Sequence, residues 1–245
     1  MTKLINIQPW ELDKANRIAK ARHQFQQFMQ YTWMRPREPL ITGHHTRIMC
    51  DRIDQAKRDY KNGISTRLII TLPFRHGKSD ASSRYLPADL LGWNPDFEII
   101  LGSYGSTLSE DFSRDVKSIV DTEAYNDIYP EFPGWDHRTD NAKQRRVASN
   151  NGKLHAVGMS GGATGKGANA LILDDVFKNR QEADSDTTRK SRWESFRNDF
   201  FSRLAPVHII LIVQTRWHVD DVIGHIRAAN DPEHEDYDEA VPKFE

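Results

Sequence analysis

Apolar side chains in the first part of the chain recur every three or four residues, which is the spacing of an amphipathic helix. This spacing predicts two helices, over residues 9–31 and 44–62. Gly63 is expected to end the second helix, and two prolines between residues 33 and 43 predict a loop there. The side chains expected to face inward are Ile18, Ala21, Phe25 and Phe28 in the first helix and Ile48, Ile53 and Ala56 in the second.

From residue 64 onward, short and continuous apolar runs alternate with helical stretches. The expected strands cover residues 67–72, 97–102, 153–157, 170–173 and 207–213. The expected helices between them cover residues 80–91, 108–121 and 187–202. Such an alternation indicates a mostly parallel sheet with helices on both faces, and such a sheet binds ligands at the carboxyl ends of its strands. The sequence therefore predicts the α/β fold class, with functional residues just after strands.

The composition fits a folded protein and excludes several classes. The chain has 245 residues, of which 38% are hydrophobic, and its formal net charge of -1 excludes a uniformly basic nucleic-acid coat protein. Cys50 is the one cysteine, which excludes an intramolecular disulfide and a cysteine-based zinc site. No apolar run is long enough to span a membrane, and the N-terminus lacks a signal-peptide pattern. The expected compartment is a reducing cytoplasm.

The charge is unevenly distributed along the chain. Residues 1–65 hold 12 Lys and Arg against 6 Asp and Glu, whereas residues 219–245 hold 2 against 9. A basic front and an acidic end suit a protein that touches a polyanion with one region only. Two solvated surface segments would produce the same pattern, so the charge alone leaves both interpretations open.

The first expected strand runs into LPFRHGKS, residues 72–79, and then into a helix, which is the context of a Walker A phosphate loop. Gly77 would let the backbone turn its N–H groups toward phosphate oxygens. Lys78 would supply positive charge to the β- and γ-phosphates, and Ser79 would offer a hydroxyl to Mg²⁺, beside the positive end of the following helix. The first glycine of the motif is replaced by Leu72, so an accidental Gly-Lys-Ser at a turn is the alternative.

A second glycine-rich stretch, GGATGKG at residues 161–167, does not fit a phosphate loop. Gly165 and Lys166 are followed by glycine instead of Ser or Thr, and Ser160 stands where the first glycine belongs. We expect either a mobile loop near a bound nucleotide or nucleic acid, or a plain flexible connector.

The apolar run at 170–173 leads into Asp174 and Asp175, the pattern of a Walker B motif. Asp174 would hold Mg²⁺ through water and the Ser79 hydroxyl, while Asp175 would orient or deprotonate the attacking water. Glu is the commoner residue at the second position, so Asp175 has a shorter reach. A surface turn after a buried strand is the alternative, but the long separation from Lys78 leaves room for intervening strands and favours a shared site.

The last expected strand ends in QTRWHVDD, residues 214–221. A polar pair after a core strand can sense the γ-phosphate, and Gln214 and Thr215 are the candidates; simple strand termination is the alternative. Trp217 is expected to pack rather than to take part in chemistry. The end of this stretch imitates a metal site, but a helix that begins with Asp220 as its cap explains it equally well.

Four segments together resemble the ATPase domain of bacteriophage large terminase subunits, the motors that package DNA into procapsids. They are LPFRHGKSD at 72–80, SYGSTLSEDFSRDV at 103–116, GMSGGATGKGANALILDDV at 158–176 and QTRWHVDD at 214–221. The resemblance covers roughly residues 64–224, with the segments in order. It implies a P-loop NTPase fold of the additional-strand type, related to helicase motors.

The resemblance implies ATP and Mg²⁺ as cofactors and assigns roles to residues. Ser79 and Asp174 would be the metal ligands, and Lys78 and Asp175 would be catalytic. Arg75 resembles an arginine that terminases often carry in the phosphate loop to stabilise charge on the transferred phosphoryl group; pairing with a nearby carboxylate is the alternative. Gln214 and Thr215 fall at the motif that couples hydrolysis to movement. The residues expected to bind nucleotide are Pro73, Phe74, Arg75, His76, Gly77, Lys78, Ser79, Gln214 and Thr215.

The resemblance also implies domains and partners. Residues 1–63 would form a helical extension that packs on the core, residues 64–230 the P-loop ATPase core, and residues 231–245 an acidic linker toward a nuclease domain. The acidic stretch is too irregular for a nuclease site, so we expect a motor domain alone, without nuclease activity. The implied partners are double-stranded viral DNA, the portal protein, the small terminase subunit and further copies in a ring, in the host cytoplasm and away from membranes. Arg203 is a candidate for reaching the nucleotide of a neighbouring copy.

Two other functions stay open from the residues alone. One is a helicase-like, DNA-dependent ATPase of another class, and the other is a nucleotide-binding assembly module that does not hydrolyse. The segment 33–45 is expected to cover the nucleotide base, but no motif says which residue does so.

Overall fold

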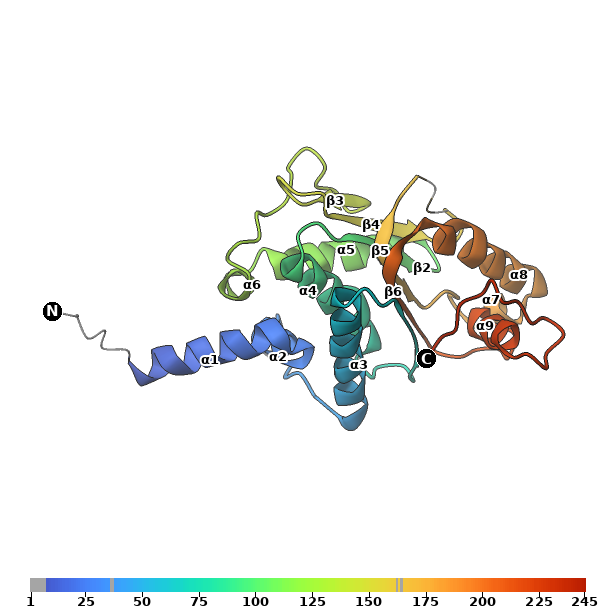
Figure 1. Cartoon of the computed structure of the whole chain (residues 1–245), viewed down its shortest axis with the longest axis horizontal. Helices are drawn as coiled ribbons and strands as arrows, with labels where there is room; N and C mark the ends of the chain where they lie inside the picture. The colour runs from blue at the N-terminus through green and yellow to red at the C-terminus, as the bar shows by residue number, and fades with distance from the viewer. Residues whose placement is uncertain (1–7, 36–37, 162, 164) are drawn as a thin grey trace.

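The structure, a computed structural model, describes residues 8–35, 38–161, 163 and 165–245. Its centre is a six-stranded sheet with the strand order β1-β6-β5-β2-β4-β3 (Figure 1). Neighbouring strands are parallel except where β3 pairs with β4. The predicted α/β fold with a mostly parallel sheet is confirmed. The strands are β1 (Thr66–Thr71), β2 (Glu98–Ser103), β3 (Gln144–Arg146), β4 (Lys153–Gly158), β5 (Ala168–Asp174) and β6 (Leu204–Gln214).

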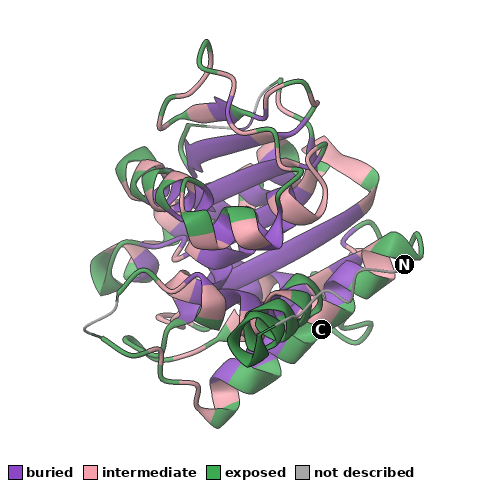
Figure 2. Ribbon diagram, turned by 90° about the vertical axis from the view of Figure 1, so that its left-hand side faces the viewer, coloured by how far each residue is buried: buried purple, intermediate pink, exposed green. Residues whose placement is uncertain are grey.

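The central strands are apolar without interruption because both faces of the sheet are covered. Ile99, Ile100 and Leu101 of β2 are fully buried, as are residues 170–173 of β5. Successive side chains point to opposite faces, so Ile99 and Leu101 belong to one apolar cluster and Ile100 to the other. Figure 2 shows the buried strands flanked by helices whose outer sides are exposed. The protein therefore has two apolar clusters, one on each face of the sheet.

One face is covered by helices from the front half of the chain, and Phe25, Phe28 and Met29 join the same cluster as Ile99. The N-terminal helices therefore share a core with the sheet, although the outer end of the first helix reaches beyond the rest of the molecule (Figure 1). These elements are α1 (Pro9–His23), α2 (Phe25–Tyr31), α3 (His44–Lys61), the π-helical turn η1 (Asp80–Tyr85), α4 (Leu86–Trp93), α5 (Ser106–Val120) and α6 (Glu123–Ile128).

The other face is covered by elements from the second half of the chain. They are α7 (Arg180–Asp184), α8 (Asp186–Glu194), the π-helical turn η2 (Ser195–Phe200), the 3-10 turn η3 (Phe201–Arg203) and α9 (Val222–Asn230). After α9 the chain returns to the outer edge of β1. There the Glu245 N–H donates to the Arg67 carbonyl and the Ile69 N–H donates to the Glu245 carbonyl, both at 2.9 Å.

The predicted strands are confirmed, and the largest shift of a strand start is at β6, which begins at Leu204 instead of 207. The helix predicted over 80–91 is η1 followed by α4, and Pro87 in the first turn of α4 has no N–H to continue the earlier pattern. The helix predicted over 187–202 is α8, η2 and η3 in succession. Residues 33–43 form a loop as predicted, except that residues 36 and 37 lie outside the described part.

Other predictions were wrong or incomplete. Ile48 is 49% exposed, because the buried stripe of α3 runs through Met49, Ile53 and Ala56, and the neighbouring position lies off that stripe. The helix predicted over 9–31 is broken at Gln24, which has an extended backbone. The elements β3, α6 and α7 were not predicted, and α9 was offered only as one of two explanations for the end of the stretch 214–221. Among the described helices, none has the length and apolar character needed to cross a membrane.

Candidate nucleotide site

Three strand ends meet at one edge of the sheet. β6 lies between β1 and β5, and all three strands are parallel. Thr71 is in register with Gln214, and Asp174 is in register with Val213. The polar residues that follow these strands are far apart in the sequence but lie side by side at the carboxyl edge, where ligands bind in sheets of this kind.

The loop after β1 turns through two residues in the left-handed conformation. Arg75 has a φ of 60° and Gly77 a φ of 73°. A Cβ on Gly77 would meet no atom within 4 Å, so this position needs glycine for its backbone and not for space. Arg75 does carry a Cβ, so its conformation costs about 1 kcal/mol or more, and strain of this kind concentrates at functional sites.

The Lys78 ammonium is buried at this edge and pairs with the second aspartate. Its side chain is 6% exposed, and Nζ lies 3.2 Å from Asp175 Oδ2. The same ammonium lies 5.2 Å from the centre of the Phe74 ring, a favourable cation–π contact. A bound triphosphate would compete with Asp175 for this positive charge.

Asp175 is held in an uncommon backbone conformation by hydrogen bonds of its N–H, its carbonyl and its side chain. Its φ is 45°, in the left-handed region. Its N–H donates to the Val213 carbonyl at 2.9 Å, and its own carbonyl accepts from the Tyr104 N–H at 3.0 Å. Its Oδ1 accepts from the Thr215 N–H at 3.2 Å. These bonds offset the strain and aim the carboxylate toward the loop.

Asp174, at the end of β5, is fully buried. Its Oδ2 accepts a 2.7 Å hydrogen bond from Ser83 Oγ, while its Oδ1 has no partner within the described part of the chain. Burial raises the pKa of Asp174 to about 6, and the charge of Asp175 acts in the same direction. The hydrogen bond from Ser83 and the nearby Ser79 hydroxyl oppose this rise, as does the charge of Lys78.

A Mg²⁺ ion fits the chemistry of these side chains. Asp174 Oδ1 is a buried carboxylate oxygen without a partner, and the Ser79 hydroxyl lies close enough to bond the same carboxylate. No cluster of three or more His, Cys, Asp or Glu side chains forms a metal site among residues that the structure describes. Mg²⁺ at nucleotide sites usually takes one or two protein ligands and fills its shell with water and phosphate oxygens, so two oxygen ligands suffice.

The two residues at the end of β6 face different ways. Thr215 is joined to the loop, since its Oγ1 donates to the Leu72 carbonyl at 3.1 Å. Gln214 is buried, and its Nε2 donates to Asp221 Oδ2 at 2.9 Å. Its Oε1 is buried without a partner in the described residues. The structure therefore places Thr215 at the candidate site, whereas the side chain of Gln214 is directed to the start of α9.

The remaining loop residues, Pro73 to His76, are exposed, and Arg75 and His76 line a cavity. The Phe74 ring contacts Trp217, with ring centres 5.2 Å apart, so Trp217 packs as expected. A cavity of about 540 Å³ lies between the loop and the segment 33–45. Its lining includes Trp33, Arg35, Leu40, His45, His76 and Gly77. The segment expected to cover the base therefore lies next to the loop.

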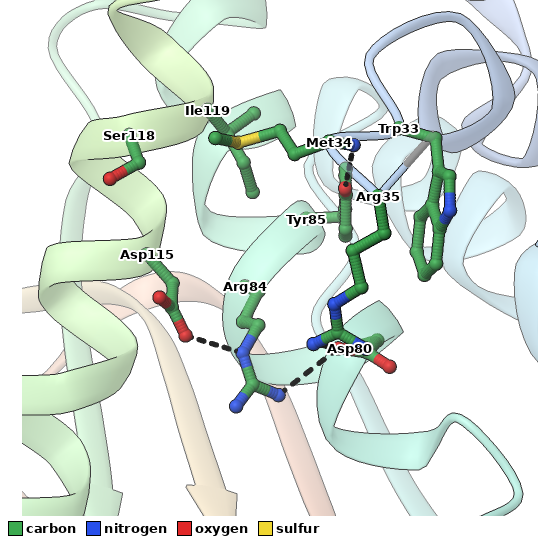
Figure 3. A pocket seen from close by; sticks show the side chains of 9 residues that line it. All are labelled: Trp33, Met34, Arg35, Asp80, Arg84, Tyr85, Asp115, Ser118 and Ile119. Carbon is green, nitrogen blue, oxygen red and sulfur yellow. Dashed lines mark hydrogen bonds and ion pairs between the residues drawn. The ribbon is translucent and has the colours of Figure 1, made fainter. Parts of the chain in front are cut away.

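A chain of ion pairs fixes the helix behind the loop (Figure 3). Asp80 Oδ1 lies 3.3 Å from Arg35 Nη2 and 3.2 Å from Arg84 Nη1. Arg84 Nε in turn lies 2.6 Å from Asp115 Oδ2 on α5. The segment around Arg35, η1 and α5 are thus tied together directly behind Ser79.

Sequence reasoning missed Ser83 and Asp221 in this region and assigned the helix cap to the wrong aspartate. Ser83, four residues beyond Ser79 on the same helix face, was not predicted, although that spacing was visible. The helix cap is Asp221 and not Asp220, since Asp221 Oδ1 accepts from the Gly224 N–H at 3.0 Å. Arg203 precedes β6 and so lies at the opposite edge of the sheet.

The stretch 161–167 is only partly described, because residues 162 and 164 lie outside the described part. Just before it, Ser160 Oγ accepts a 2.7 Å hydrogen bond from Arg192 Nη1 on α8. The expectation that this stretch lies near a nucleotide or nucleic acid stays a prediction.

The fold and the loop define a class: an α/β domain with a P-loop-like turn at the carboxyl edge of a mostly parallel sheet. The family model described as "Terminase large subunit, T4likevirus-type, N-terminal" matches residues 69–241, well over half of the chain. The chain belongs to this terminase large subunit family.

A solved structure agrees with this assignment at the level of the fold. The crystal structure of the HK97 bacteriophage large terminase matches with a TM-score of 0.51 and 14% sequence identity. The match covers 88% of this chain and 41% of that chain, so the chain spans about two fifths of the HK97 protein. A search of curated proteins found no match.

Proposed function

We propose that the chain is the ATP-hydrolysing motor domain of a DNA-packaging terminase and drives double-stranded DNA into procapsids. Membership of the terminase family supports the general role. The observation that carries the enzymatic part is the 3.2 Å pair of Lys78 Nζ and Asp175 Oδ2 beside a glycine turn at the carboxyl edge of the sheet. A buried cation and a carboxylate next to a phosphate-sized loop are the parts that phosphoryl transfer requires.

Each loop residue then has a chemical task. Gly77 and its neighbours present backbone N–H groups to the phosphates, and Lys78 binds the β- and γ-phosphate oxygens. Ser79 and Asp174 hold Mg²⁺, which neutralises charge on the phosphates when bound. The exposed Arg75 lies at the tip of the loop and would stabilise the charge of the transferred group.

The ion pair suggests an order of events at the site. Lys78 exchanges Asp175 for the phosphates when nucleotide binds, because both compete for one ammonium. Asp175 Oδ2 is then free to accept a hydrogen bond from the attacking water, while Oδ1 stays with the Thr215 N–H. Asp175 thus becomes available as a base only when a triphosphate is present.

The 540 Å³ cavity beside the loop is our candidate for the adenosine part of the nucleotide. It opens next to Gly77 and offers the aromatic ring of Trp33, which is already stacked on Tyr85 with ring centres 5.5 Å apart. Arg35 lies over the same Trp33 ring at 5.6 Å. Aromatic rings and guanidinium groups stack on planar bases, so a base would take the place of Arg35 on the Trp33 ring.

The first test is steady-state phosphate release by Lys78→Ala and Asp175→Ala. Both variants should lose turnover by about 100-fold or more, because each removes charge that stabilises or enables the transfer. Lys78→Ala should also bind ATP more weakly, whereas Asp175→Ala should bind it at least as well, since it frees the ammonium. Turnover and nucleotide affinity, by titration with a fluorescent ATP analogue, are the two measurements.

Lys117→Ala and Asp121→Ala are matched controls, because this partly exposed ion pair lies at the C-terminal end of α5 and neither residue bonds to the loop. Turnover unchanged in Lys78→Ala and Asp175→Ala would contradict the proposal. Tight ATP binding without phosphate release, even with DNA and portal present, would instead select the assembly module. Strand separation on a forked duplex would select the helicase-like class.

The partners and the division of the chain belong to the same proposal. The family supports DNA and packaging partners in general, and we propose double-stranded DNA, the portal protein, the small terminase subunit and a ring of copies in the host cytoplasm. We also propose residues 1–63 as an extension, 64–230 as the ATPase core and 231–245 as a linker. Arg203 lies at the amino ends of the strands, away from the site of its own chain, and would then contact the nucleotide of a neighbouring copy.

A further inference from the structure

The start of α9 is built around a buried carboxylate that the proposed reaction does not use. Asp221 is fully buried. One oxygen, Oδ1, caps α9 by accepting from the Gly224 N–H at 3.0 Å. The other, Oδ2, lies 2.9 Å from Gln214 Nε2 and 2.8 Å from Arg216 Nε. Burial raises the pKa of Asp221, and the Arg216 charge and the backbone bonds oppose that rise.

The two partners of Asp221 are the sequence neighbours of Thr215, the residue that bonds to the candidate site. Gln214 and Arg216 stand on either side of Thr215, whose N–H binds Asp175 and whose hydroxyl binds the Leu72 carbonyl. A movement of the backbone at Thr215 would therefore act on the hydrogen bond from Gln214 and on the ion pair with Arg216.

The loop between β6 and α9 is held by internal hydrogen bonds and close packing, so it would pass on a movement of the strand end instead of absorbing it. Arg216 Nη2 donates to the His218 carbonyl at 3.1 Å and to the Val219 carbonyl at 2.9 Å. A Cβ on Gly224 would come within 1.9 Å of the Val219 carbonyl oxygen, so this loop rests directly on the first turn of α9. Gln214 Oε1 is buried without a partner in the described residues, so only the Nε2 side of its amide is fixed by a hydrogen bond.

The far end of α9 is connected as well. Asn230 Nδ2 donates to the Val241 and Pro242 carbonyls at 3.1 and 3.3 Å, and the Phe244 N–H donates to Asn230 Oδ1 at 3.3 Å. These bonds hold the segment 241–245, whose last residue, Glu245, pairs with the outer edge of β1. A shift of α9 thus reaches the surface of the sheet beside the strand that leads into the loop.

We propose that Asp221 is a positioning residue that transmits the nucleotide state from Thr215 to α9. Its two partners receive the movement of the strand end, and its helix cap passes this movement to α9. This role rests on the proposed ATPase function, because the signal is the exchange of Asp175 partners when nucleotide binds. A merely structural cap would not need Gln214 and Arg216.

The test is Asp221→Ser, because serine still caps a helix but is too short to bind Gln214 and Arg216 as well. Thr122→Ala is the control: it removes a helix cap of α6, the 3.1 Å bond from the Tyr125 N–H, on the other face of the sheet. Arg216→Met, which leaves the cap intact, is the second variant if Asp221→Ser folds poorly. Three quantities are measured on each protein: affinity for a non-hydrolysable ATP analogue with Mg²⁺, turnover, and amide hydrogen exchange of α9 with and without the analogue.

In the wild type we expect the analogue to change the exchange of the α9 amides. In Asp221→Ser and Arg216→Met this nucleotide-dependent difference should vanish and kcat should fall by about 10- to 100-fold, while affinity stays within about threefold. Thr122→Ala should keep the difference and the turnover.

The inference would be overturned if the hydrogen exchange of the α9 amides in the wild type did not change when the analogue binds. It would also be overturned if Asp221→Ser turned over ATP as fast as Thr122→Ala. A wild type that neither binds nor hydrolyses ATP would instead refute the proposed function itself, so the two failures can be told apart.

Discussion

At the scale of a single residue, the metal-binding role proposed for Asp174 conflicts with the stability of the free protein. Its carboxylate is fully buried, has one hydrogen bond from Ser83 and leaves Oδ1 without a partner in the described structure. Leaving a buried acceptor unpaired is costly, and a bound cation would remove that cost. The residue is therefore better suited to the liganded protein than to the free one.

This conflict predicts a pH dependence of the free protein. The pKa of Asp174 is raised from 3.8 to about 6, so its protonated form is favoured by folding. Its stabilising effect is present below about pH 4 and is lost as pH rises through about 6. Asp174→Asn should raise the free energy of unfolding at pH 7.5 by about 1–3 kcal/mol and abolish this contribution.

The measurement is urea unfolding of both proteins, without nucleotide or Mg²⁺, between pH 4 and 8. Only the difference between them is compared, because the buried His155, whose pKa is lowered to about 4, loses stability as pH falls in the same range. An Asp174→Asn variant that is less stable than the wild type at pH 7.5 would contradict the argument.

At the scale of elements, the helices on the first face are tied together by buried polar contacts. Lys57 Nζ of α3 lies 2.5 Å from Asp89 Oδ2 of α4, and the Tyr129 hydroxyl after α6 donates to Asp89 Oδ1 at 2.6 Å. Asp89 is fully buried. This cluster links the helices before the phosphate loop to those behind it.

Lys57→Met should therefore destabilise the protein by about 3–5 kcal/mol, because it leaves a buried carboxylate without its cation. The double variant Lys57→Met with Asp89→Asn should recover part of that loss, since the uncompensated charge is gone. Thermal or urea unfolding measures both. A double variant less stable than Lys57→Met alone would show that the pair is not the source of the effect.

At the scale of the whole molecule, the uneven charge bears on the proposed partner. Residues 1–65 hold 12 Lys and Arg against 6 Asp and Glu, and residues 219–245 hold 2 against 9, so the net charge of -1 hides two regions of opposite sign. A polyanion would approach the first region and avoid the second.

We accordingly expect double-stranded DNA to bind through its phosphates. In a plot of the logarithm of the binding constant against the logarithm of the salt concentration, the slope should be about -0.9 for each phosphate that the protein neutralises. The slope should be the same for different DNA sequences. Fluorescence anisotropy with two unrelated duplexes at several salt concentrations measures this. Affinity that is insensitive to salt, or that differs strongly between the duplexes, would exclude phosphate-dominated binding.

The sequence was most informative where the structure depends on residues that are close together in the sequence. Continuous apolar runs predicted the strands because a strand covered on both faces has no polar side. Gly77 could be recognised as a turn because its backbone needs a positive φ. Ile48 was misjudged because helical spacing alone does not say which of two adjacent apolar positions faces the core.

Other features depend on contacts that periodicity does not contain. The break at Gln24 is stabilised from outside the helix, by Asp54 of α3, which accepts from the Phe25 N–H at 3.0 Å. The short strand β3 exists because it pairs with β4. The choice of Asp221 over Asp220 as a cap follows from its burial against Gln214.

The sequence by itself determined the class of fold, the glycine turn after the first strand and the acidic pair after β5, because apolar runs, glycine and charge act through local physics. Only the tertiary structure decided that β6 lies between β1 and β5, and hence that Lys78 meets Asp175 at 3.2 Å while Gln214 turns to Asp221. Strand order and side-chain partners arise from packing between residues far apart in the chain, and no local pattern encodes which of several apolar strands will be neighbours.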